Sequence, residues 1–78
     1  MQKIRPDMDI GKNIRRLRKR AKLTQEQTVA QLELMGVSIS KSTYAKIETN
    51  RMNIKVSELI GLSKIFAAEI SEFFYGLL

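Results

Sequence analysis

The chain is 78 residues long with a hydrophobic share of 44%, which fits one small helical domain and excludes an enzyme of several domains. It contains neither cysteine nor histidine, so disulfide frameworks, zinc fingers, reactive thiols and imidazole-dependent catalytic triads are excluded. No apolar stretch approaches the roughly 20 residues of a membrane span, and the first ten residues lack the apolar centre of a signal peptide. We therefore expect a cytoplasmic protein.

The net charge of +6 comes from one end of the chain. Residues 1–22 hold nine basic and two acidic side chains, whereas residues 23–78 hold five basic and six acidic ones. A positive region on an otherwise balanced domain attracts polyanions over about a Debye length, near 8 Å at physiological salt. The candidates are nucleic acid, an anionic membrane or an acidic protein, and the alternative is a solvated helix face that keeps the protein soluble.

The first elements are an arm and a helix. Residues 1–8 show no apolar period, and Pro6 disfavours a helix through the residue before it, so we expect a flexible basic arm. Asp9 can cap a helix that follows. Its apolar residues fall at spacings of four, three and four, which trace one face: Ile10, Ile14, Leu17 and Ala21. Arg18 lies on the edge of this buried stripe.

A second helix is predicted over Thr24–Met35. Thr24 and Gln27 have the spacing of a capping box, and Gly36 is suited to a left-handed residue after the last turn. Val29 and Leu32 are expected to face inward. Thr28 and Met35 are further candidates for the same stripe.

A third helix is predicted from Ser40, which can cap it, to about Thr49. Tyr44 and Ile47 are expected to point inward, and Glu48 lies at the edge of their stripe. The opposite face is built from short polar and flexible cationic side chains: Lys41, Ser42, Ala45, Lys46 and Thr49. A face without bulky apolar groups allows a helix backbone to approach base edges in a groove.

The last third of the chain predicts a turn over 50–53 and two more helices. One spans Lys55 to Phe66, with mostly inward apolar residues: Val56, Leu59, Ile60, Leu62 and Phe66. The other follows Ser71 as its cap and contains Phe73 and Phe74. Five helices with short connections predict an all-α orthogonal bundle.

Three segments in order carry a more specific pattern: IRRLRKRAKLTQEQ, then SKSTYAKIETNR, then VSELIGLSKIFAAEISEFF. Together they resemble the helix-turn-helix family of phage repressor and Cro proteins, often called XRE-type, over about Ile10 to Phe74. The resemblance implies a lambda repressor-like DNA-binding domain over residues 9–78, preceded by the arm of residues 1–8. It also implies a nucleoid-associated, sequence-specific regulator of transcription, expected to repress by occupying a promoter, with no cofactor, metal or small-molecule ligand indicated.

The resemblance assigns roles to single positions. It places the third helix (40–49) in the major groove, with five side chains facing base edges: Lys41, Ser42, Ala45, Lys46 and Thr49. Lysine can donate to guanine, serine can serve either role, and an alanine methyl can meet the thymine methyl. Without the resemblance, the same residues would be an ordinary solvent-facing surface.

Phosphate contacts are implied at both ends of this motif. Gln25 occupies the position at which family members grip a phosphate, with Thr24 beside it at a helix N-terminus that attracts anions. Asn50 and Arg51 match a second backbone-binding position. A broader positive potential, or simply a solvated face, comes from the first helix: Lys12, Arg15, Arg16 and Lys19.

Arg18 and Glu48 correspond to a pair that forms a partly buried salt bridge between the first and third helices of the family. We therefore expect Arg18 to be structural rather than a DNA contact. The sequence also departs from the family pattern. The spacing from Leu23 to Ile47 is about five residues longer than usual, which predicts a longer second helix and a larger turn, and Val29 stands where a small residue is usual.

A homodimer on a palindromic operator is the usual arrangement in the family, since two half-sites double the contacts. The apolar end of the chain offers a possible symmetric contact through Phe74, Leu77 and Leu78, although simple packing on the monomer core explains it nearly as well. The competing function is a helix-turn-helix module that binds protein, as an antitoxin, antirepressor or adaptor. A membrane-surface role is disfavoured because the first helix needs its apolar face for the core, and no pair of carboxylates indicates an enzyme.

Overall fold

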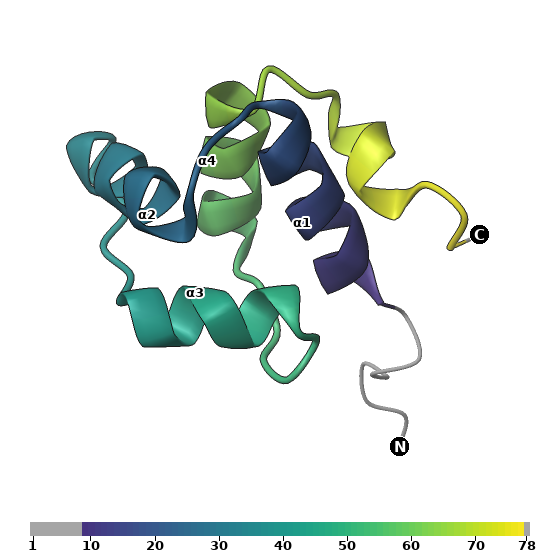
Figure 1. Cartoon of the computed structure of the whole chain (residues 1–78), viewed down its shortest axis with the longest axis horizontal. Coiled ribbons are helices and arrows are strands. Elements are labelled where there is room, and N and C mark those ends of the chain that lie inside the picture. The colour runs from purple at the N-terminus through teal and green to yellow at the C-terminus, as the bar shows by residue number, and fades with distance from the viewer. Residues whose placement is uncertain (1–8, 78) are drawn as a thin grey trace.

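The computed structural model describes residues 9–77, and every element in this range is helical. These residues form four α-helices and a final 3₁₀-helix, η1, arranged in space as Figure 1 shows. Their bounds are α1 (Ile10–Arg20), α2 (Gln25–Leu34), α3 (Lys41–Glu48), α4 (Val56–Ile65) and η1 (Ile70–Phe74). The all-helical prediction is confirmed in this range, but the fifth predicted helix is a single 3₁₀ element. The expected arm over residues 1–8 lies outside the described residues, as does Leu78.

The first three helices begin at the caps that the sequence predicted. Asp9 accepts from Lys12 N at 3.0 Å, and Ser40 accepts from Thr43 N at 3.0 Å. Thr24 and Gln27 form the reciprocal capping box, with bonds of 2.9 and 3.0 Å between side chains and backbone N–H groups. These bonds satisfy amide donors that a helix leaves unpaired at its N-terminus.

The last two elements begin differently from the prediction. Lys55 N donates to Glu58 at 2.8 Å, so a buried carboxylate three residues along closes the start of α4. Glu69 N donates to Glu72 in the same way at 2.9 Å, which makes Glu69, and not Ser71, the residue that precedes η1. The prediction of Ser71 as the cap was wrong, because η1 begins at Ile70 and the Glu72 carboxylate accepts a hydrogen bond from the Glu69 N–H.

A core of nine buried apolar residues joins all five elements: Ile14, Leu17, Leu32, Tyr44, Ile47, Leu62, Phe66, Ala68 and Phe73. Thr28 is also buried, and Val29 is half-buried against the core. The inward prediction is wrong at three positions. Val56 and Ile60 are 73% and 46% exposed because the α4 stripe runs through Leu62 and Phe66 instead. Met35 is 42% exposed because it lies beyond the last turn of α2.

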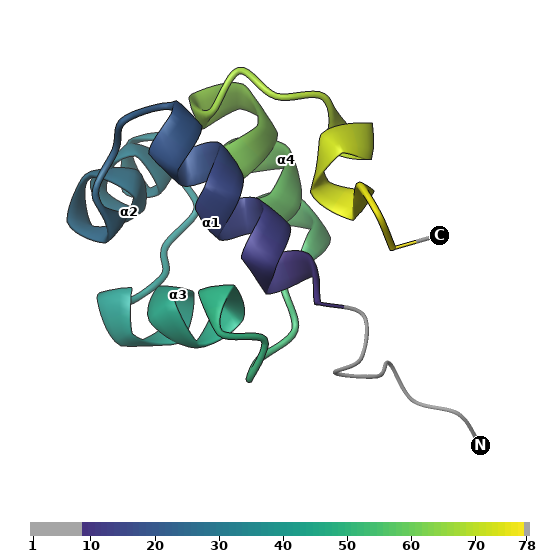
Figure 2. The ribbon, with the colours of Figure 1, turned by 45° about the vertical axis from the view of Figure 1, so that its right-hand side comes forward.

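The α3 helix lies along one edge of the molecule. In Figures 1 and 2 it runs below α1 and α2, with its outer side turned away from the other helices. It contacts α1 and α2, while η1 covers the far side of α1. The approach of α1 is close, since a Cβ on Gly11 would stand 2.4 Å from Ile47 O and 2.6 Å from Glu48 O. Only glycine fits there, so Gly11 fixes how near α1 comes to the end of α3.

Candidate nucleic-acid interface

The outer face of α3 has the character that the sequence predicted. Lys41, Ser42, Lys46 and the C-cap Thr49 are exposed, and Ala45 between them is half-buried. The opposite face is packed into the core through Tyr44 and Ile47. The helix therefore presents short and flexible polar side chains to solvent along its whole length.

Two side chains on this face already have partners. Lys41 Nζ lies 3.8 Å from Glu26 Oε2 in the first turn of α2, in an exposed and hence weak ion pair. The Thr49 hydroxyl donates toward Ala45 O and Lys46 O at 3.2 Å each and accepts from Arg51 Nε at 3.2 Å. Because the Thr49 hydroxyl is engaged on its own chain, its methyl group is the part that remains for contact with a ligand.

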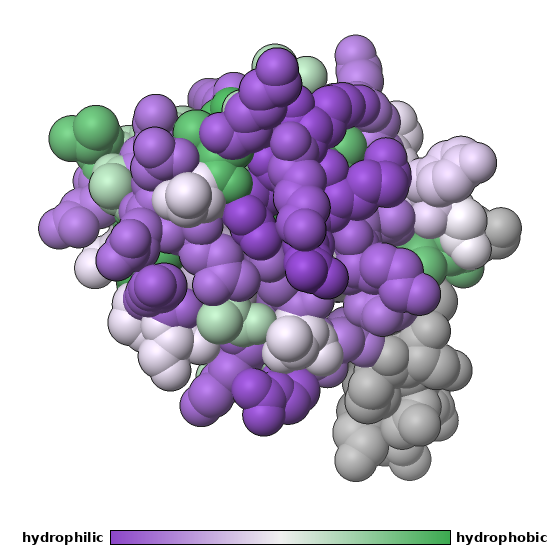
Figure 3. Space-filling model, in the orientation of Figure 1, coloured by the Kyte–Doolittle hydropathy of each residue, from purple (hydrophilic) through white to green (hydrophobic). Residues whose placement is uncertain are grey.

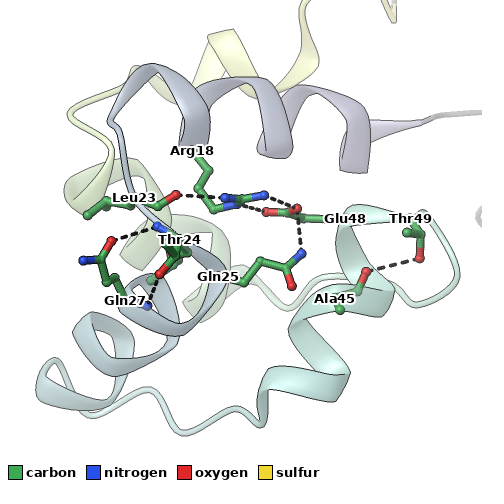
Figure 4. Close-up of polar contacts among 9 residues, drawn as sticks. Arg18, Leu23, Thr24, Gln25, Gln27, Ala45, Glu48 and Thr49 are labelled. Atoms are coloured by element: carbon green, nitrogen blue, oxygen red, sulfur yellow. Dashed lines mark hydrogen bonds and ion pairs between the residues drawn. The ribbon is translucent and has the colours of Figure 1, made fainter.

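The expected ion pair between α1 and α3 is present and buried. Arg18 Nε donates to Glu48 Oε2 at 2.6 Å and Arg18 Nη2 donates to Glu48 Oε1 at 3.1 Å. A third donor, Arg18 Nη1, reaches Leu23 O at 2.8 Å, in the turn between α1 and α2 (Figure 4). Side-chain exposure is only 11% for Arg18 and 2% for Glu48. The bidentate geometry identifies Arg18 as a structural residue that holds three elements together.

Gln25 joins the same cluster. Its Nε2 donates to Glu48 Oε1 at 3.0 Å, so the first residue of α2 is held against the last residue of α3 (Figure 4). An amide nitrogen carries two hydrogens, and this bond uses one of them. Glu48 therefore fixes the orientation of the side chain that the sequence predicted as a phosphate contact.

The electrostatics of the cluster follow from its burial. Burial alone would raise the pKa of Glu48, but hydrogen bonding from Arg18 and Gln25, together with the nearby Tyr44 hydroxyl, lowers that pKa below its ordinary value. The Tyr44 hydroxyl is buried without a well-formed hydrogen bond, and burial raises its pKa. Glu48 is thus a carboxylate that stays ionised inside the protein.

The other predicted phosphate contacts flank α3. Thr24 is exposed at the start of α2, and its hydroxyl is used in the capping box. Asn50 follows α3 in a left-handed conformation, with φ of +62°, and Arg51 beside it is exposed. Of the predicted contacts, the structure brings Gln25 to the last turn of α3. Asn50 and Arg51 follow in the turn that comes directly after this helix.

The connection between α2 and α3 is large, as the spacing predicted. Residues 35–40 separate the two helices, and Gly36 has the expected positive φ of +85°. Val37 and Ile39 are half-buried against the core, so the turn is anchored at two points. A turn of about 3–4 residues is usual in this motif, so the connection over residues 35–40 places more chain than usual between α2 and α3.

The end of the chain packs back on α1. Phe73 is fully buried and stacks on Phe66 with ring centroids 6.5 Å apart, and Phe74 is half-buried against the core. Asn13 Nδ2 donates to both Phe73 O and Tyr75 O at 2.9 Å. The monomer thus uses much of the apolar surface considered for a dimer. Leu77 is half-buried, and Leu78 lies outside the described residues.

Two of these residues were missed from the sequence. Gly11 and Asn13 both lie in the first turn of α1, and each makes a contact across the fold. A glycine inside a helical pattern signals close packing, and Asn13 stands on the apolar stripe at three residues from Ile10. Those two departures from the pattern were the available signals.

The fold and the exposed face of α3 define a helix-turn-helix protein, and comparison with known families agrees. A family model described as a helix-turn-helix domain matches residues 11–76, so the chain belongs to the helix-turn-helix domain family. This match is consistent with the resemblance to phage repressors and suggests a DNA-binding regulator. No curated protein and no solved structure matches the chain. Within residues 9–77, no helix has both the length and the apolar character to cross a bilayer.

Proposed function

We propose that this chain is a sequence-specific regulator of transcription that binds double-stranded DNA by inserting α3 into the major groove, and that it acts as a repressor. A protein that occupies a promoter blocks other proteins from it, so repression needs only binding. The DNA-binding unit comprises residues 9–78, with residues 1–8 as a basic arm. The carrying observation is the outer face of α3, on which Lys41, Ser42, Lys46 and Thr49 are exposed around the half-buried Ala45, with no bulky apolar group among them.

Base recognition is assigned to five residues: Lys41, Ser42, Ala45, Lys46 and Thr49. Lysine donates to guanine O6 and N7, and the Ala45 and Thr49 methyl groups suit contact with the thymine methyl. The engaged hydroxyl of Thr49 supports this apolar role. Each good base contact contributes roughly 1–3 kcal/mol of discrimination.

Phosphate contacts are assigned to Thr24, Gln25, Asn50 and Arg51. Glu48 holds the Gln25 amide against α3, which leaves the second amide hydrogen for a phosphate oxygen. The backbone N–H groups at the start of α2 add to the attraction of an anion. Arg51 lies just beyond α3, so phosphates on both walls of the groove would be held.

The operator is proposed to be palindromic and to bind two chains. Two half-sites about 34 Å apart, one helical turn, match the symmetry of a homodimer. Phe74, Leu77 and Leu78 remain the proposed contact, and exposed Ile70 and Tyr75 beside them enlarge the available surface.

The test is selection of binding sites from random duplexes, followed by affinity measurements with two variants. Lys46→Ala should reduce discrimination between the selected site and random DNA, because it removes a base contact. Gln25→Ala should weaken binding to all duplexes alike, because it removes a phosphate contact. Thermal melting of both variants controls for the lost bond between Gln25 and Glu48.

Three outcomes would contradict the proposal. Recovery of no sequence from the selection would remove sequence-specific binding. Equal loss on cognate and random DNA for both variants would overturn the assignment of roles. Tight binding to a protein partner, with weak and sequence-indifferent DNA binding, would establish the protein-interaction module instead.

A further inference from the structure

The outward side of α1 carries four cations around a shallow hollow. Lys12, Arg15, Arg16 and Lys19 line an open depression of about 300 Å³, and all four are exposed. We call these residues the basic face of α1. Figure 3 shows hydrophilic residues over the part of the surface where α1 lies. None of the four has a role in the DNA contacts proposed above.

The charges of the basic face are unbalanced. Within residues 9–77, Lys12, Arg15 and Lys19 make no ion pair and no side-chain hydrogen bond. No acidic residue occurs inside α1. Arg16 is held at one edge by Asn13 Oδ1 at 3.3 Å and lies over the ring of Tyr75, 5.6 Å from its centroid. As far as residues 9–77 are concerned, the surface thus offers three cations with no internal partner and one arginine, Arg16, already fixed in place.

The spacing of these residues makes a stripe. They stand at positions i, i+3, i+4 and i+7, so they share one side of the helix. At 1.5 Å of rise per residue the stripe is about 10.5 Å long. A strand of duplex DNA carries one phosphate per about 3.4 Å of axis, so the charge density of a duplex is high enough for several cations of the stripe to act on it together.

Three of the four cations are turned away from the α3 interface. Gly11 and Arg18 are α1 residues that meet α3. One residue turns a helix by about 100°, so Lys12, Arg16 and Lys19 stand about 80–140° around α1 from Gly11. Arg15 lies between Gly11 and Arg18 in sequence and forms the border of the basic face nearest to α3. The outer face of α3 itself points away from α1, because Tyr44 faces the core. A duplex lying on α3 and a polyanion lying on the basic face would approach from different sides.

The geometry points to a second nucleic-acid site: the basic face of α1 binds the phosphate backbone of a second DNA duplex, without sequence preference, while α3 holds the first. The inference rests on the proposed function for the first duplex only. Arginine can grip a phosphate through two parallel N–H bonds, and lysine adds point charges on either side of the hollow. One chain would then bridge two DNA segments.

A duplex fits this surface better than the other polyanions. A membrane-bound helix inserts apolar residues, whereas Ile14 and Leu17 of α1 are fully buried in the core. The centre of a protein interface is depleted of charged residues and rich in aromatic anchors. The basic face is charged throughout and has one aromatic residue, Tyr75, at its edge.

The test immobilises the selected duplex, saturates it with protein and then adds a short labelled duplex of unrelated sequence. The wild-type chain should capture the second duplex. The variant Lys12→Gln/Arg16→Gln/Lys19→Gln removes the three charges that are turned away from α3, so it should hold the first duplex as well as wild type and capture at least tenfold less of the second. The control Lys22→Gln/Lys55→Gln/Lys64→Gln loses the same charge from exposed sites elsewhere and should capture as much as wild type.

Each outcome of this experiment leads to a different conclusion. Equal capture by the basic-face variant would overturn the inference, since a second α3 in a dimer would then hold the second duplex. Capture of anionic vesicles or of an acidic protein in place of DNA would overturn it as well. If wild type does not bind the first duplex, the proposed function fails, and the basic face is tested alone. It is then supported only if neutralising it lowers the salt slope of binding to random duplex, by about 0.9 per charge removed.

Discussion

Glu48 is the residue of α3 at which side chains from α1 and α2 meet. Its carboxylate accepts two bonds from Arg18 and one from Gln25, so it connects α1, α2 and α3 at one point. Stability and proposed recognition therefore depend on the same side chain. The ion pair holds α3 in the fold, and the bond to Gln25 orients the side chain that is proposed to contact a phosphate.

Removal of Arg18 should destabilise the domain strongly. Arg18→Ala leaves the Glu48 carboxylate buried without its main partner, and breaking such a pair typically costs about 3–5 kcal/mol. That is a large share of the stability of a small domain. Urea denaturation measures the change. Arg15→Ala on the exposed side of the same helix is the matched control, expected within about 0.5 kcal/mol of wild type.

An equal effect of the two substitutions would mean that Arg18 contributes no more than an exposed arginine. The buried ion pair would then have no part in holding α1 to α3.

Acid should weaken the fold through Glu48. The folded state lowers the pKa of this carboxyl below its unfolded value of about 4.3, so the unfolded chain binds the proton first as the pH falls. The stabilisation from Glu48 is complete above the unfolded pKa and is lost as the pH falls through the folded pKa. Melting temperatures measured from neutral pH down to acid should therefore decline below about pH 4.5.

Glu48→Gln is the comparison, since it has no proton to gain. Its melting temperature should start lower at neutral pH and change less on acidification. A wild-type profile parallel to that of the variant would show that Glu48 does not cause the decline.

Single residues were predictable where the pattern made them conspicuous. Arg18 and Glu48 stood at the edges of apolar stripes, and a charge in that place requires a partner. The bond from Gln25 to Glu48 was not predictable, because it depends on where the start of α2 meets the end of α3. Sequence spacing predicts the face of a helix on which a side chain lies, but it does not predict where two helices cross.

Helix starts were the most predictable elements. Asp9, Thr24 and Ser40 each act through an acceptor that reaches a backbone N–H within one turn, so local sequence suffices. The fourth helix was predicted in place but with two outward residues, Val56 and Ile60, assigned inward. An apolar helix shows no sharp periodicity, and tertiary packing then selects the buried side.

For the last element, unlike the helix starts, the local sequence does not determine the structure. Residues 70–74 form a 3₁₀-helix between left-handed Ala67 and Gly76, whose φ angles are +51° and +78°. A segment this short gains little from helix propagation, so packing of Phe73 decides its form. Propensity alone therefore could not distinguish an α-helix from a 3₁₀ turn here.

Gly11 should be the most sensitive glycine. A Cβ at this position would lie 2.4 Å from Ile47 O, a backbone oxygen of α3. A side chain can rotate to relieve such a contact, whereas a backbone oxygen moves only together with its helix. Gly11→Ala should therefore destabilise the domain by about 1–3 kcal/mol, although alanine favours helix in general. Gly61→Ala is the control, because the Cβ there would meet only side-chain atoms, Leu32 Cδ2 at 2.8 Å and Val37 Cγ2 at 4.0 Å, and no backbone atom within 4 Å.

Chemical denaturation of both variants decides the matter. A Gly11→Ala protein as stable as wild type would mean that α1 and α3 are not locked at this distance. DNA affinity should fall with stability in Gly11→Ala, since the substitution displaces α3 relative to α1.

The molecule presents different chemistry on different sides. The α3 face is polar, the basic face of α1 is cationic, and apolar side chains remain exposed near the end of the chain. Composition predicted the excess of positive charge and its location in the first 22 residues. It did not predict that part of the apolar surface at residues 73–77 would be buried within the monomer, because that depends on how Phe73 and Phe74 pack.

Two chains should bind one palindromic duplex through the remaining apolar surface. Ile70→Glu/Leu77→Glu should lower the proportion of the two-chain complex seen by sedimentation, while binding to a single half-site stays at the wild-type level. Both side chains lie at the end of the chain, and Ile70 is exposed. Val56→Glu places the same charge on exposed α4 and should leave the two-chain complex intact.

A single chain per palindrome at saturating protein would rule out the homodimer on DNA. Equal loss with Val56→Glu would indicate a general effect of charge instead of a contact at the chain end.

The two hydrogen bonds from Asn13 to Phe73 O and Tyr75 O also determine when α1 can pack during synthesis. They tie the first turn of α1 to residues that are made 60 and 62 positions later in synthesis. Until Phe73 and Tyr75 have been translated, one side of α1 has no cover. Native packing of α1 therefore waits for these residues, and a product truncated before Phe73 would lack it.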